Sequence, residues 1–343
     1  MTSLGRTSDD TSLQFILNSF LNLHLSSIVL LLEGNIRKSS IQIIKMSELL
    51  TITSASGKQA SHLIPHLYQK QQYKLRLVVR SQSSKERLSK QYPEAEVTTA
   101  DLTSPADCDR ILEGATAVYY IGPIGVHETQ MGYHMVDASV KQLQAGKFKH
   151  FVFSSVLNTQ LRKLLNHDGK RYVEEYLMES DLNYTILSPS NFMDQFNVPK
   201  IVESRSWSAP WNPEQPFAQT ALCDLGEAGA KVLSEREKHY FAQYQIVSTL
   251  PKPYLFMIEE IERQVGRKIE VKRLSHDEAF KTFVPMAVGQ DAPRAAKEIL
   301  ERLVFHYNRH SLKGNPNTLR WLLGREPTDH AAFVRIGLEQ AKQ

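Results

Sequence analysis

Short apolar runs alternate along much of the chain with longer stretches whose apolar residues have a helical spacing. Leu49 to Thr53 is an apolar, β-branched run, as expected for a strand buried on both faces of a parallel sheet. After it, Leu63, Ile64 and Leu67 lie three and four positions apart, which gives a helix one apolar face. The pattern therefore predicts a strand, a turn of small residues and a helix that begins near Lys58.

The same alternation continues for about 120 residues. Because the predicted strands are separated by helices, we expect an α/β protein with a doubly wound parallel sheet of Rossmann type. Ligands of such sheets bind outside the carboxyl ends of the strands. The five further strands are predicted at residues 74–80, 95–100, 117–121, 148–155 and 183–187.

The turn after the first strand is built from Ser54, Ala55, Ser56 and Gly57. Small side chains let a ligand approach the backbone, and the N–H groups at the start of the next helix point toward the turn. Such a site attracts anions, and in a βαβ unit the anion is usually a dinucleotide pyrophosphate. A strand–turn–helix unit without a ligand explains the residues equally well.

Arg80 ends the second predicted strand, and Ser84 and Lys85 follow closely. In Rossmann folds this strand end meets the adenosine ribose, where a basic residue accommodates the 2′-phosphate of NADP. Guanidinium and hydroxyl groups match phosphate oxygens. We therefore expect NADP(H) rather than NAD(H), the alternative being a solvated basic loop.

Several stretches resemble the NmrA-like family of atypical short-chain dehydrogenases/reductases. Thr53 to Ala60 resembles the family turn T-G-A-T-G-x-x-G, with Ser54 in place of the first glycine. Residues 185–193 match T-I-L-x-P-x-x-F-M, and residues 324–327 match G-R-x-P. The resemblance spans residues 46 to about 338. It departs from the family at Ser54, where a Cβ would be strained if φ is positive.

The resemblance also implies a role for Lys170. Short-chain dehydrogenases carry Y-x-x-x-K on one helix face, and here Lys170 matches the lysine while Asn166 replaces the tyrosine. Asn166 cannot titrate, so Lys170 is the one catalytic residue that we expect, as a ligand of the nicotinamide ribose. The alternative is a solvated helix lysine. For His167 we expect an ordinary surface position rather than a role in proton transfer.

The remaining expected cofactor contacts also lie at strand ends. In the family, a pair such as Asp101-Leu102 lies beside the adenine, although Asp101 could equally cap the helix near Pro105. The turn at residues 190–193 closes over the nicotinamide in relatives, or else covers the core at a domain junction. The full predicted set is Ser54, Ala55, Ser56, Gly57, Lys58, Gln59, Arg80, Ser84, Asp101, Leu102, Ile121, Gly122, Pro123, Lys170, Ser190, Asn191, Phe192 and Met193.

The length of 343 residues suggests more than one core. We expect a non-family extension at residues 1–45, an NADP-binding Rossmann domain at 46–197 and a smaller α/β substrate lobe at 198–343. The extension is either an incorrectly assigned start or a poorly ordered tail, with a membrane tether as the alternative because residues 13–32 are apolar but interrupted. Trp207 and Trp211, in a proline-rich stretch, suggest a substrate lid.

Composition narrows the function. A net charge of +4 without a basic block gives no sign of nucleic-acid binding, and two distant cysteines favour a reducing cytosolic compartment without disulfides or a metal cluster. We expect an NADP(H)-dependent oxidoreductase for a small carbonyl, alkene or quinone-like substrate, with a role in secondary metabolism. The alternatives are a non-catalytic dinucleotide-binding redox sensor with a protein partner, or a scaffold without cofactor.

Overall fold

The apolar runs form a seven-stranded sheet in which every neighbouring pair of strands is parallel. The computed structural model describes residues 48–340. Six of the seven strands lie where the sequence predicted them. The strand order is β11-β6-β5-β4-β1-β2-β3, so the first strand lies inside the sheet. The strands are β1 (Glu48–Ile52), β2 (Tyr73–Val79), β3 (Glu96–Thr99), β4 (Ala117–Ile121), β5 (His150–Ser154), β6 (Tyr184–Pro189) and β11 (Ala242–Ile246).

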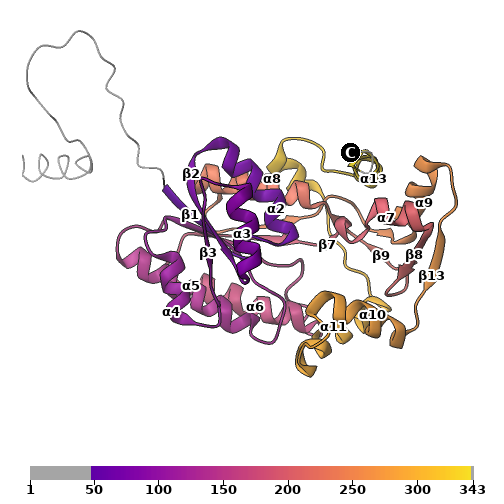
Figure 1. Ribbon diagram of the computed structural model, residues 1–343, viewed down its shortest axis with the longest axis horizontal. Helices are drawn as coiled ribbons and strands as arrows, with labels where there is room; N and C mark the ends of the chain where they lie inside the picture. The colour runs from indigo at the N-terminus through magenta and orange to yellow at the C-terminus, as the bar shows by residue number, and fades with distance from the viewer. Residues whose placement is uncertain (1–47, 341–343) are drawn as a thin grey trace, which may run out of the picture. The chain divides into compact units, whose positions relative to one another are not determined.

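Helices cover both faces of this sheet (Figure 1). One face packs against α2 (Lys58–Lys70), α3 (Gln82–Gln91), α8 (Leu222–Glu235) and α12 (Asn317–Leu323), whose apolar residues share one core with β1 and β2. The other face packs against α4 (Pro105–Leu112), α5 (Glu128–Gln144) and α6 (Leu165–Met178) around a second core. The predicted doubly wound α/β architecture is therefore confirmed.

A third core belongs to a smaller lobe. Its short parallel pair is β8 (Ser206–Ala209) with β13 (Glu270–Arg273). Its helices are α7 (Val198–Ser204), α9 (Leu255–Val265), α10 (His276–Val288), α11 (Arg294–Tyr307) and α13 (His330–Gln340). Two-residue strands connect it to the sheet region, namely β7 (Asn191–Phe192), β9 (Pro216–Phe217), β10 (Gln219–Thr220) and β12 (Lys252–Pro253), together with 3₁₀ turns at Met193–Gln195 and Arg236–His239.

The chain returns to the first domain after entering this lobe. β11 extends the large sheet by pairing with β6, and α8 packs on α2 closely enough that a Cβ at Gly226 would overlap the carbonyl of His62. The predicted division at residue 198 therefore does not separate the cores, because residues 222–246 belong with the sheet. An edge strand of alternating polarity, AQYQI, carries a weaker signal than a buried strand.

The two tryptophans do not form a lid. Trp211 is buried, with its ring 5.4 Å from that of Tyr254, and Trp207 stacks on Phe196 at 5.1 Å. Both belong to the core of the smaller lobe, so the lid interpretation is wrong. Aromatic rings bury a large apolar area, and packing inside the lobe takes precedence over the exposure that neighbouring prolines suggested.

The prediction for residues 1–45 lies outside the described residues. Within residues 48–340, no helix is both long and apolar enough to cross a bilayer. In the same range, no three histidine, cysteine or acidic side chains come together as metal ligands. Cys108 and Cys223 are both free thiols.

Candidate functional site

The turn after β1 has a positive φ at Ser54, the position where the family motif has glycine. Ser54 has φ of +49°, in the left-handed region that favours glycine. Its hydroxyl donates to the carbonyl of Ile121 at 2.9 Å, and Thr53 both donates to that carbonyl and accepts from the Ile121 N–H at 2.8 Å. These bonds fasten the turn to the end of β4, which offsets the strain of the missing glycine.

The N-terminus of α2 is open. Gly57 is its N-cap in an extended conformation, and no side chain caps the helix. The first backbone bond into the helix runs from Ser61 to Gly57, so the N–H groups of residues 58–60 have no acceptor among the described residues. A Cβ at Gly57 would lie 3.2 Å from the Ser54 carbonyl. This end can therefore hold an anion through backbone N–H groups.

Two side chains of α2 reach other elements beside this end. Lys58 donates to the carbonyl of Asp194 at 3.2 Å, and Gln59 accepts from the hydroxyl of Ser154 at 2.7 Å. Ala55 is buried and Ser56 is exposed. The helix start is thereby held against β5 and against the 3₁₀ turn that follows β7.

At the end of β2, Arg80 is exposed and makes no ion pair or side-chain hydrogen bond with any residue of the described range. Ser81 caps α3 by accepting from the Ser84 N–H at 3.3 Å, and the two hydroxyls are 2.9 Å apart. Ser84 is thus partly engaged in the cap, while the Arg80 guanidinium remains available for a ligand.

At the end of β3, the Asp101 side chain forms hydrogen bonds within its own turn. It accepts from the backbone N–H and the hydroxyl of Thr103 at 2.9 and 2.8 Å, and these bonds hold its pKa below the usual range. Ser104, rather than Asp101, caps α4. Leu102 is buried in the core, and its carbonyl lies 3.1 Å from a ring nitrogen of His134. At the end of β4, Ile121 and the following Gly122 are buried, and Pro123 is exposed.

Lys170 lies inside the molecule, paired with a carboxylate that the sequence did not suggest. Its ammonium group forms an ion pair with Glu128 of α5, and the side chains are only 10% and 5% exposed. The ammonium also lies 5.8 Å from the centre of the Phe153 ring. Burial raises the pKa of Glu128, while Lys170 opposes that rise. The alternative of a solvated helix lysine is therefore excluded.

Three polar atoms near this pair are buried without a hydrogen-bond partner among the described residues: the Tyr120 hydroxyl, Asn166 Oδ1 and His167 Nε2. His167 is fully buried, its Nδ1 lies 3.1 Å from the Asn158 carbonyl, and burial lowers its pKa to about 4. The expectation of a surface histidine is wrong, because the segment before α6 folds over this turn of the helix.

Glu174 is a second buried carboxylate that the sequence analysis did not predict as a site residue. Glu174, one helical turn after Lys170, accepts from the hydroxyls of Ser155 and Thr159 at 2.5 and 2.8 Å. Burial raises its pKa, and the two hydroxyl bonds act in the opposite direction. The spacing of four from Lys170 was the available signal, since it places both side chains on one face of α6.

The turn after β6 contacts the smaller lobe. Ser190 donates to the Ala218 carbonyl at 2.6 Å, and Asn191 bridges the hydroxyls of Tyr254 and Tyr307 at 2.9 and 3.2 Å. Met193 is fully buried, and Phe192 packs partly against the core of the sheet. These contacts are those of a domain junction, which was one of the two interpretations of this turn.

The structure thus brings an open helix start, a free guanidinium and a buried lysine–glutamate pair to the carboxyl ends of β1, β2, β4 and β5. Backbone N–H groups and Arg80 suit phosphate groups. Asn166, which is buried one turn before Lys170, offers an amide but no titratable proton.

Solved structures share this fold. An NADPH-dependent quinone oxidoreductase from Escherichia coli, complexed with NADPH, is 20% identical, with a TM-score of 0.67 over 84% of this chain and 99% of that one. A triphenylmethane reductase from Citrobacter sp., complexed with NADP(H), is 19% identical, with a TM-score of 0.67 over 85% and 99%. NmrA, a negative transcriptional regulator in complex with NADP, is 17% identical, with a TM-score of 0.66 over 87% and 98%.

No curated protein matches the sequence. The family model described as the NmrA-like family matches residues 46–329, which is most of the chain and includes all the strands of the large sheet. The chain belongs to the NmrA-like family.

Proposed function

We propose that this protein is an NADP(H)-dependent oxidoreductase that reduces a small carbonyl, alkene or quinone-like substrate. The observation that carries the proposal is the pairing of an uncapped α2 N-terminus with an exposed Arg80 that has no partner among the described residues. The helix start suits the pyrophosphate, and Arg80 suits the 2′-phosphate that distinguishes NADP from NAD. Two of the similar solved structures are reductases in complex with this cofactor.

The bound cofactor would supply the hydride, and the chain supplies orientation and charge. Lys170 would hold the nicotinamide ribose. Its partner Glu128 compensates its charge in the buried site. Because Asn166 cannot release a proton, the proton that accompanies hydride transfer would come from water.

The test is a fluorescence titration with NADPH and with NADH. In the Arg80→Gln variant, NADPH binding is expected to weaken roughly tenfold to hundredfold, the range of one charge-assisted contact, while NADH binding changes little. Lys90→Gln on the exposed surface of α3 is the matched control and should leave both affinities unchanged. Equal weakening for both nucleotides, or no binding by the parent protein, would refute the proposal.

A second candidate function is a non-catalytic dinucleotide-binding redox sensor with a protein partner. The replacement of the tyrosine by Asn166, together with the Lys170–Glu128 pair, favours it, and one similar structure is a transcriptional regulator. A panel of quinones and carbonyl compounds at saturating NADPH decides between the two. Turnover that Lys170→Ala abolishes supports the enzyme, whereas NADPH binding without turnover on any substrate supports the sensor.

Compartment and pathway belong to the same proposal. Two free cysteines, one of them buried, suit a reducing cytosol. A role in secondary metabolism would follow from a quinone-like or polyketide-like substrate, so the same panel tests it.

A further inference from the structure

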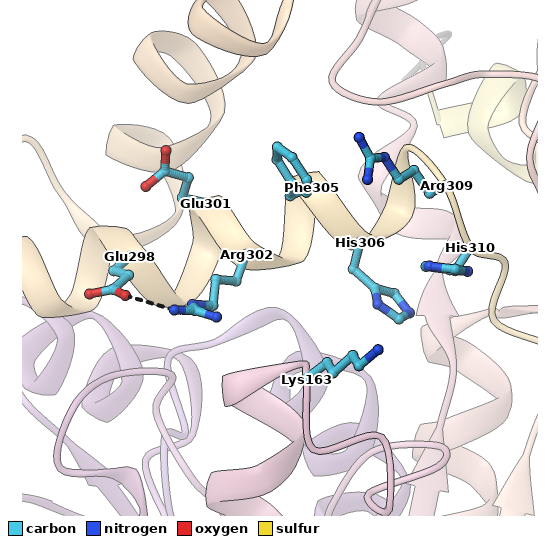
Figure 2. Close-up of a pocket in the computed structure, with 8 residues that line it drawn as sticks. All are labelled: Lys163, Glu298, Glu301, Arg302, Phe305, His306, Arg309 and His310. Carbon is cyan, nitrogen blue, oxygen red and sulfur yellow. Dashed lines mark hydrogen bonds and ion pairs between the residues drawn. The ribbon is translucent and has the colours of Figure 1, made fainter.

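An open surface cavity of about 550 Å³ lies between α11 and the segment that leads into α6. Lys163 and His310 are exposed at this surface, and His306 is partly buried. Lys163 comes from that segment, His306 from the last turn of α11, and His310 from the residues that follow it. Figure 2 shows these three side chains directed into the same space. The two imidazole rings are 4.8 Å apart, and none of the three side chains forms an ion pair with another described residue.

Two acidic side chains, Glu298 and Glu301, also line the cavity. Glu298 forms an ion pair with Arg302 at 3.3 Å, about two helical turns before His306. Glu301 and Arg309 line the same cavity, but in Figure 2 their side chains point away from Lys163 and His306. With both histidines neutral, the lysine and arginine side chains of the lining exceed its glutamates by one charge.

The elements packed around His306 add no negative charge at this point. From α6, the buried His167 is close enough that charge on His306 lowers its pKa. From α10, His276 contacts Phe305, with the rings 5.6 Å apart. Burial lowers the pKa of His306 itself, and His310 and Lys163 lower it further. An anion bound between these basic groups would offset their mutual repulsion and oppose the lowering of the His306 pKa.

A metal ion fits this arrangement less well. His306 and His310 are four residues apart, a spacing that can chelate a transition metal, but Lys163 would repel it. The described residues place no third ligand beside them. Three convergent basic groups instead match the several acceptor oxygens of an oxyanion.

We propose that this cavity binds an oxyanion, either a free phosphate or the acidic group of a small molecule, through Lys163, His306 and His310. The site lies against α11 and is separate from the α2 end on which the dinucleotide proposal rests. The cavity has room for a small molecule beyond the anionic group itself. Anion binding at this cavity does not require that the protein reduces a substrate.

The test is a calorimetric titration of the full chain with sulfate. Sulfate stays a dianion between pH 8 and pH 6, so a change in affinity over that range reports on the protein. We expect saturable binding at millimolar concentration or below, with affinity that rises at least about threefold as the pH falls and the histidines gain protons. No saturation at about 20 mM sulfate overturns the proposal.

Variants locate the site. Lys163→Gln is expected to weaken sulfate binding about tenfold, the loss of one charge-assisted contact, and His306→Gln to flatten the dependence on pH. Lys90→Gln is the control of equal charge change and should bind as the parent does. Sulfate binding that Lys163→Gln leaves unchanged overturns the assignment.

Competition then separates the two sources of the anion. Displacement of sulfate by phosphate alone identifies a free-ion site, and displacement by benzoate as well identifies a site for an acid group on a small molecule. Zinc binding that His306→Gln removes, without any sulfate binding, overturns the oxyanion proposal in favour of a metal.

Discussion

Two residues of the candidate site show how a side chain changes meaning once its surroundings are known. In the sequence, Ser54 is a departure from a glycine-rich turn. In the fold its φ is +49°, and its hydroxyl holds the carbonyl of Ile121. Lys170 matches a motif in the sequence, but its buried partner Glu128 lies 42 residues away along the chain. For both residues, the sequence predicts the position in the fold, but it does not predict the partner that the side chain contacts.

Replacing Ser54 separates strain from hydrogen bonding. Ser54→Gly should relieve about 1 kcal/mol of left-handed strain and lose a hydrogen bond of similar worth, so stability should change by less than about 1 kcal/mol. Ser54→Ala keeps the strain and loses the bond, and should destabilise by about 1–2 kcal/mol. Urea unfolding measures both. Ser54→Gly should also tighten NADPH binding, and a weaker affinity would show that the hydroxyl helps to shape the turn.

Glu128 is expected to be essential for the local fold. Glu128→Gln removes the direct ion-pair partner of the buried Lys170 ammonium, which should cost about 3–5 kcal/mol of unfolding free energy. The double variant Glu128→Gln with Lys170→Met removes both charges and should recover most of that loss. Chemical denaturation of the four proteins of this cycle gives the coupling energy. If the single variant is as stable as the parent, the pair is not desolvated as described.

At the scale of elements, glycine positions report how closely helices approach one another. Gly226 of α8 faces the backbone of α2, and a Cβ there would overlap the His62 carbonyl. A Cβ at Gly169 of α6 would make only ordinary van der Waals contacts, the nearest being 3.5 Å from the Thr129 hydroxyl oxygen. Both glycines lie inside helices, so the local sequence does not distinguish them.

Substituting each of these glycines by alanine should therefore have opposite effects. Gly226→Ala forces α8 away from α2 and should destabilise by about 2–3 kcal/mol, as overpacking of a close contact does. Gly169→Ala gains helix propensity at little steric cost and should be neutral or stabilising by up to about 1 kcal/mol. Thermal unfolding of both variants compares them. A destabilised Gly169→Ala would mean that the neighbourhood of Glu128 is tighter than described.

At the scale of the whole molecule, buried histidines make stability depend on pH. Burial lowers the pKa of His150 to about 3 and those of His167 and His330 to about 4. The unfolded chain binds these protons near pH 6.5, so the stability they contribute is present above pH 6.5 and declines as the pH falls toward 4.

Between pH 6.5 and pH 5, each of these histidines should reduce the unfolding free energy by up to about 2 kcal/mol. Urea unfolding followed by circular dichroism at the two values measures the loss. His330→Gln, which removes one titrating group, should show a smaller loss than the parent. The control is His66→Gln on the partly exposed surface of α2, which should keep the full pH dependence.

Apolar periodicity by itself predicted six of the seven strands of the large sheet, the helices between them and the carboxyl edge where the candidate site lies, because buried parallel strands and amphipathic helices impose local patterns. The strand-end position predicted Arg80 as a cofactor ligand, and the motif resemblance predicted Lys170. Tertiary structure alone decided that β11 and α8 rejoin the sheet, that Trp211 and His167 are buried, and that Glu128 pairs with Lys170. Those outcomes depend on contacts between residues far apart in the chain, and no local pattern encodes such contacts.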